Sequence, residues 1–156
     1  MQQFSLYHAS EGSLYKTACQ LVEKSYHNKF KIIILTPDIE AQELLNKLIW
    51  TYSRKQFIPH GSKLDPLPEK QPIYLTSELE NPNQANVLII LAPFNIEEIL
   101  SNAPYIGHFQ RIIIIYEEGV NLDKMINTIS NLAAPSPAVK CYKQHPMGTW
   151  SNQEQN

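Results

Sequence analysis

Glycine and aspartate are scarce in this chain of 156 residues, and each scarcity argues against a class of site. The loop HASEGS at residues 8–13, which follows the first expected strand, contains the single glycine Gly12. The common phosphate-binding loops need at least two glycines at fixed spacing, so we expect no nucleotide-binding loop there. The few aspartates, Asp38, Asp65 and Asp123, provide poorly for a magnesium site that handles phosphoryl transfer.

Cysteine is equally rare, and no catalytic or metal-binding motif is present. Cys19 and Cys141 form neither a CxxC spacing nor a recognisable nucleophile context. The histidines are scattered, and none has a second ligand at a spacing that would place two ligands on one helix face or hairpin. They are His8, His27, His60, His108 and His145. We therefore predict no metal, no cofactor and no catalytic residue.

Strong charge of one sign is also lacking. The formal net charge is -2, with 18% charged and 43% hydrophobic residues, which is typical of a soluble globular protein. A protein that coats duplex DNA is usually strongly basic, so direct duplex binding is not expected. The N-terminus has no basic segment followed by an apolar run, and no apolar stretch approaches membrane-spanning length, so we expect a cytoplasmic protein without a membrane contact.

Apolar runs rich in β-branched residues recur at long intervals, which favours strands that alternate with helices. The runs span residues 4–8, 31–36, 72–76, 87–92 and 111–116, and helical patterns lie between most of them. This order predicts an α/β fold, with a mainly parallel sheet of about five strands and flanking helices. We expect one domain over residues 1–150 and a solvated C-terminal tail over residues 151–156.

Two helix starts carry candidate caps. Ser10 or Ser13 could cap the first helix, whose apolar residues fall at helical spacing from Leu14 onward. Thr36 is a candidate cap for the second helix, with Pro37 at its first position and acidic residues in its first turn.

The stretch LIWTYSRKQFIPHG, residues 48–61, is the most unusual part of the chain. It places Trp50 at the expected end of the second helix and Phe57 after a polar turn that contains Arg54 and Lys55. Aromatic anchors beside arginine have the composition of a protein-binding surface. Two interpretations remain open at this point, since Trp50 and Phe57 could equally fill the bottom of the core.

The chain contains, in this order, FSLYH, a helix-end tryptophan followed by FIPHG, QPIYLT, an NPN before the apolar segment VLIIL, FQRIIIIYE and the terminal Trp150. Together these segments resemble the chi subunit of the bacterial DNA polymerase III holoenzyme. The most specific of them is the helix-end tryptophan followed by FIPHG, and the NPN and Trp150 support it. The resemblance extends from about residue 3 to residue 150.

The resemblance implies a non-catalytic replication adaptor with a Rossmann-like fold that binds no nucleotide. Chi proteins join the psi subunit of the clamp loader on one side and the acidic C-terminal tail of single-stranded DNA-binding protein on the other, so they contact DNA only indirectly. The apolar patch that contacts psi corresponds here to Trp50, Phe57, Ile58, Pro59 and His60.

The second contact departs from the family pattern, which is a basic and aromatic C-terminal helix. Ala138 and Val139 replace its leading arginine and aromatic residue, and Pro135 and Pro137 interrupt any continuous helix. The resemblance implies a tail contact through Lys124, Lys140, Tyr142 and Lys143. Without the arginine, whose guanidinium binds carboxylates with two hydrogen bonds, we expect a weaker or differently placed contact.

Two alternatives belong to other functional classes. One is a small α/β enzyme whose acid or base is His8 or His60 at the end of a strand. The other is a protein that binds single-stranded nucleic acid directly through aromatic and basic residues in the unusual stretch, namely Trp50, Tyr52, Arg54 and Lys55.

Overall fold

The computed structural model describes residues 2–52, 58–63, 65–133 and 137–153. Within these residues seven strands form one sheet in the order β3-β2-β4-β5-β1-β6-β7. All neighbouring strands are parallel except β6 and β7, which form an antiparallel edge. The strands are β1 (Gln3–His8), β2 (Ile32–Leu35), β3 (Ile73–Thr76), β4 (Val87–Leu91), β5 (Arg111–Tyr116), β6 (Ala138–Gln144) and β7 (Trp150–Gln153).

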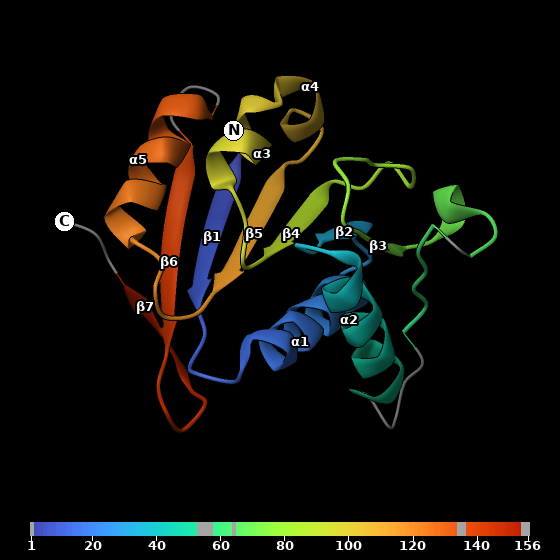
Figure 1. The fold of residues 1–156 in the computed structure, drawn as a ribbon, viewed down its shortest axis with the longest axis horizontal. Coiled ribbons are helices and arrows are strands. Elements are labelled where there is room, and N and C mark those ends of the chain that lie inside the picture. Colours follow the sequence, from blue (N-terminus) through green and yellow to red (C-terminus); the bar gives the residue numbers. More distant parts are fainter. Residues whose placement is uncertain (1, 53–57, 64, 134–136, 154–156) are drawn as a thin grey trace.

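Helices cover both faces of this sheet (Figure 1). α1 and α2 lie on one face, and α3, α4 and α5 lie on the other. Their bounds are α1 (Leu14–His27), α2 (Ile39–Tyr52), α3 (Ile96–Ser101), α4 (Ala103–Ile106) and α5 (Leu122–Leu132), and a short 3-10 helix, η1 (Pro68–Lys70), precedes β3. The predicted α/β class is confirmed, although the sheet has seven strands in the described residues rather than about five.

The strands β2, β3 and β4 are buried along their whole length. Their sequences IIIL, IYLT and VLIIL are nearly continuous apolar runs, as expected for parallel strands that have a packed layer on both faces. The side chains that alternate on these strands therefore enter two separate cores.

One core lies between the sheet and α3, α4 and α5, and its members include Phe4, Leu6, Phe109 and Met125. The other lies between the sheet and α1 and α2, and its members include the fully buried Leu45 from α2. Because Phe4 and Leu6 both enter the first core, the face of β1 toward α1 is left to Gln3, Ser5 and Tyr7.

The cap of α2 differs from the prediction. Asp38, not Thr36, caps the helix. Its Oδ1 atom accepts a hydrogen bond from the backbone N–H of Ala41, with 2.7 Å between the oxygen and the nitrogen. Thr36 is buried, and its hydroxyl lies 3.1 Å from the Asp38 carbonyl and 3.3 Å from the Thr76 carbonyl. The helix begins at Ile39, two residues beyond Pro37, so Thr36 fixes the turn before the helix instead of its first turn.

The start of α1 is held by a residue from another part of the chain. Ser13 occupies the cap position, but its hydroxyl makes no capping hydrogen bond. The Ser10 hydroxyl lies near the hydroxyl of Ser13 and donates to the side chain of Gln144. The backbone N–H of Leu14 instead donates to the carboxylate of Glu117, which follows β5 and suits the positive end of a helix.

The C-terminal strands β6 and β7 are not among the five strands that the sequence predicts. The β6 segment AVKCYKQ mixes polar and apolar residues without strict alternation and lacks the long β-branched run of the central strands. Pro137 directly precedes β6, and its missing N–H prevents a helix from continuing into this segment. β7 includes residues 151–153 of the expected tail, and residues 154–156 lie outside the described part.

We predict that Asp38→Ala lowers the free energy of unfolding by about 1 kcal/mol, because it leaves the N–H of Ala41 without its capping carboxylate. Urea denaturation followed by circular dichroism measures this change. The control is Glu40→Ala, which removes an exposed acidic residue from the same turn. An equal loss of stability in both variants would contradict the cap assignment.

Candidate protein-binding surfaces

The end of α2 places Trp50 against His60. The indole is 53% exposed, whereas His60 beneath it is only 7% exposed. Their ring centroids lie 4.6 Å apart with the planes tilted by 56°. The Nδ1 atom of His60 lies 2.7 Å from the carbonyl oxygen of Ile58 and therefore donates to it, which fixes the ring orientation. The other ring nitrogen, Nε2, is buried without a hydrogen-bond partner in the described structure.

The segment that carries His60 is tied to the outermost parallel strand. Gly61 donates its N–H to the carbonyl of Ile73 at 3.0 Å and accepts from the N–H of Leu75 at 2.9 Å. A Cβ atom at Gly61 would lie 2.9 Å from the side chain of Gln71, so a larger residue would disturb this close approach. The pairing with β3 therefore holds residues 58–61 beside the end of α2.

We call the described residues Trp50, Ile58, Pro59 and His60 the tryptophan surface. Trp50 is exposed and Pro59 is half-buried, whereas Ile58 and His60 are buried and support them from below. Phe57, which the sequence adds to this set, lies outside the described residues. The exposure of Trp50 excludes the interpretation in which its side chain fills the core.

The basic residues expected to contact an acidic tail do not form one surface. Cys141 belongs to the core on the α5 side, so by alternation Lys143 also points to that side. Tyr142 stacks on Tyr7, whose ring packs on the α1-side core, and Lys140 points the same way. The expected set is therefore divided between the two faces of the sheet.

Lys124 lies at the start of α5, on the same face as Lys143. Its backbone N–H donates to the Asn121 side chain, which caps the helix. Lys124 also lines a cavity of about 370 Å³ between α3 and α5. Phe94 and Met125 give this cavity an apolar wall, and Glu97 adds one carboxylate to its rim.

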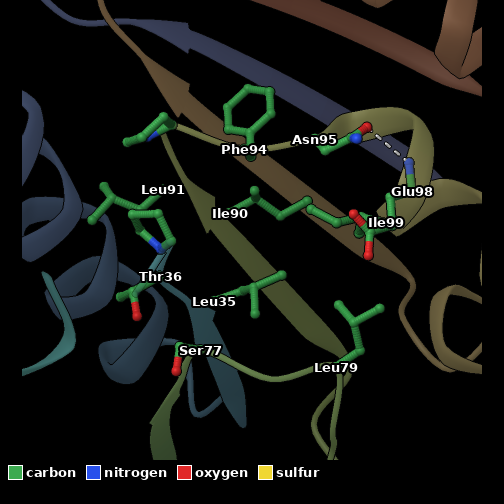
Figure 2. A pocket seen from close by; sticks show the side chains of 12 residues that line it. Leu35, Thr36, Ser77, Leu79, Ile90, Leu91, Phe94, Asn95, Glu98 and Ile99 are labelled. Atoms are coloured by element: carbon green, nitrogen blue, oxygen red, sulfur yellow. Dashed lines mark hydrogen bonds between the residues drawn. The ribbon is translucent and has the colours of Figure 1, made fainter. Parts of the chain in front are cut away.

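A second cavity, of about 500 Å³, lies at the carboxyl ends of β2, β3 and β4 (Figure 2). Neighbouring strands send their following helices to opposite faces here, which is the usual ligand position in an open α/β sheet. Figure 2 shows Leu35, Ile90 and Ile99 on its apolar floor. Glu98 gives the lining one carboxylate, and no lysine or arginine is among the described lining residues, so this cavity does not suit a phosphate group.

The two histidines proposed as a catalytic acid or base have different surroundings. His8 pairs with Glu118 at 3.3 Å and stacks on Tyr116, with ring centroids 4.8 Å apart. The contact is an ion pair only when His8 is protonated. Because Glu118 is 83% exposed, the pair contributes little to stability. His60 bonds to a backbone carbonyl beside Trp50, an arrangement that supports packing rather than proton transfer.

The described residues contain no group of three histidine, cysteine, aspartate or glutamate side chains that could hold a metal ion. In the same part of the chain, none of the helices has the length and apolar character needed to cross a membrane.

Comparison with known proteins identifies the family of this chain. A family model described as "DNA polymerase III chi subunit, HolC" matches residues 1–124. The chain belongs to the DNA polymerase III chi subunit family. A curated relative from Rickettsia prowazekii (strain Madrid E), named "Probable DNA polymerase III subunit chi", is 52% identical over 151 residues, which cover 97% of this chain and 92% of the relative. Membership in this family connects the chain to DNA replication.

The sequence did not point to an aromatic cluster on the α1 side of the sheet. Tyr7 stacks on Tyr142 with ring centroids 4.7 Å apart, and Trp150 meets Tyr7 edge-on at 5.3 Å. Residues from the first strand and the last hairpin of the sheet meet here, so no local motif predicts the cluster. The available signal is the alternation QFSLYH, which leaves one face of β1 polar and aromatic.

We predict that acrylamide quenches the fluorescence of Trp50 more strongly than that of Trp150, because Trp50 is exposed and Trp150 is half-buried. The variants Trp50→Phe and Trp150→Phe separate the two contributions, since the chain has only these two tryptophans. If Trp50 resists quenching as well as Trp150 does, then the tryptophan surface is covered in solution.

Proposed function

We propose that this chain is a non-catalytic accessory subunit of DNA polymerase III that joins two protein partners in the cytoplasm. A psi-like subunit of the clamp loader binds one surface, and the acidic C-terminal tail of single-stranded DNA-binding protein binds another. The observation that carries this proposal is the exposed Trp50 on a buried support. Membership in the chi family supplies the functional context.

The psi-like partner binds the tryptophan surface. Trp50 is the central anchor, since exposed tryptophans on well-packed supports are frequent hot spots of protein interfaces. His60 keeps the indole in position through ring contact, and its own orientation is fixed by the Ile58 carbonyl. Pro59 adds apolar area beside the anchor. Phe57 is included in the proposed contact because it directly precedes Ile58 in the sequence.

We assign the acidic tail to the α5 side of the sheet. Lys124 and Lys143 point to this side, and the cavity beside Lys124 can receive an apolar side chain against Phe94 and Met125. The carboxylate of Glu97 on the same rim repels an acidic ligand, so we expect weak binding. Because the attraction to the lysines is electrostatic, we expect the binding to weaken further with salt. Lys140 and Tyr142, which belonged to the same expected set, face α1 and are left out of this contact.

We predict that Trp50→Ala weakens binding of the psi-like partner by about thirtyfold, which corresponds to a hot-spot loss of about 2 kcal/mol. The fold stays intact because this indole is half exposed. Purification of the tagged chain from its own cells, with mass spectrometry of the co-purifying DNA polymerase III subunits, measures the effect. Met147→Ala, at a side chain that is 94% exposed and lies on the β6–β7 turn, is the matched control. Undiminished recovery of the partner with Trp50→Ala would refute this interface.

We predict that Lys124→Glu weakens binding of a peptide with the acidic tail sequence, and that Lys140→Glu leaves it nearly unchanged. Both lysines are exposed, and both substitutions change the charge equally. A difference in affinity between the two variants therefore reports which face of the sheet the peptide binds. Fluorescence anisotropy at increasing salt follows the binding, which should weaken steadily as screening increases. The opposite ranking of the two variants would move the tail to the α1 side. Retained affinity after removal of the terminal residues of the peptide would refute tail recognition.

A further inference from the structure

The α1 side of the sheet carries polar side chains on β1 and β6 and at the first residue of β5, whereas Ile113 and Ile115 of β5 are apolar on the same face. β1 lies between β5 and β6, and the register aligns Arg111 with Gln3, and Ser5 with Lys140. The next row aligns Tyr7 with Tyr142. On the opposite face the same strands bury apolar side chains, so this polar character is a property of one face only.

Two cavities follow these polar side chains beside α1. Their volumes are about 260 and 290 Å³, and both are lined by Tyr7, Leu21, Lys24 and Tyr142. The shared lining makes them neighbouring parts of one groove, which we call the α1 groove. The small side chains of Ser5 and Ala138 leave space for the first cavity. Trp150 lines the second.

The charge of the α1 groove is entirely positive. Lys24 from α1, Arg111 from β5 and Lys140 from β6 line it, and all three are exposed. Among the described residues that line the two cavities, none is aspartate or glutamate. This contrasts with the net charge of -2 for the whole chain. The local field therefore favours an anionic ligand.

Aromatic rings accompany these charges. Tyr7, Tyr142 and Trp150 form the cluster at one end of the groove, and Phe30 lies beneath the Arg111 guanidinium at 5.2 Å. Rings next to cations are the typical elements of a surface on which bases stack while phosphates meet lysine and arginine. The amides of Gln3 and Asn28 can both donate and accept hydrogen bonds, which suits the edges of bases.

We propose that the α1 groove binds a short single-stranded nucleic acid segment, with its phosphates near Lys24, Arg111 and Lys140 and its bases against the aromatic cluster. An acidic peptide fits less well. An extended peptide commonly binds by adding its backbone to the edge of a sheet, whereas this groove crosses the face of the central strands. The site is separate from the tryptophan surface and from Lys124, so it does not depend on either proposed partner contact.

The test is a titration of the full-length chain with a fluorescein-labelled oligothymidylate and the matching oligouridylate at low ionic strength, followed by anisotropy. Three phosphate contacts predict a plot of log affinity against log salt with a slope of about -2. The double variant Lys24→Gln and Lys140→Gln should weaken binding about tenfold at low salt and reduce the slope to about -0.7. The control double variant is Lys16→Gln and Lys47→Gln, which removes two exposed lysines elsewhere on α1 and α2. Unfolding curves of both variants verify that the fold is retained.

The two tryptophans provide an internal reference for the location of the ligand. In ¹⁵N-labelled protein, the indole N–H signal of Trp150 should shift on addition of oligonucleotide, and the signal of Trp50 should stay in place. Absence of binding at low salt, equal loss of affinity in both double variants, or a shift of Trp50 alone would each overturn the proposal. Equally tight binding of polyglutamate with the same shift of Trp150 would show that the α1 groove is an acidic-peptide site and would also overturn it.

Discussion

The alternation of side chains along parallel strands decides which surface each functional residue joins. Because β1 pairs with β5 and β6 in a single register, a residue on any of these strands belongs either to the α5 side or to the α1 side. Neighbouring residues such as Tyr142 and Lys143 are therefore directed to opposite faces. A slip of one residue in β6 would exchange these assignments and place Cys141 outside the core.

This constraint also explains how much of the molecule the sequence predicts. The five central strands and the helices α1, α2, α3 and α5 are marked by long apolar runs and helical spacing, which are local signals. The C-terminal strands have weaker local signals, and their stability comes from pairing with β1 and with each other. Ser13 was predictable as a cap position of α1, but the carboxylate that accepts the N–H of Leu14 was not, because Glu117 comes from another part of the chain.

The candidate surfaces divide in the same way. The sequence marks Trp50 as a candidate, because an aromatic residue at a helix end beside a polar turn is a local feature. The burial of His60 beneath it depends on the pairing of Gly61 with β3, which the sequence does not reveal. The expected set of tail contacts follows a family pattern along the chain, so it combines residues that the sheet separates. Lys24, Arg111 and Lys140 are far apart in the sequence. The strand order and the position of α1 bring them to one groove.

The pairing of Gly61 with β3 has one more consequence, for the behaviour of the chain in solution. β3 is the outermost strand on its side of the sheet, and a bare outer strand offers unpaired backbone groups to other chains. The segment at residues 58–61 occupies part of that edge through the two hydrogen bonds of Gly61. The same segment that supports Trp50 thus shields the sheet against association with a second copy. A partner that holds this segment in place would protect the chain from aggregation as well as recruit it.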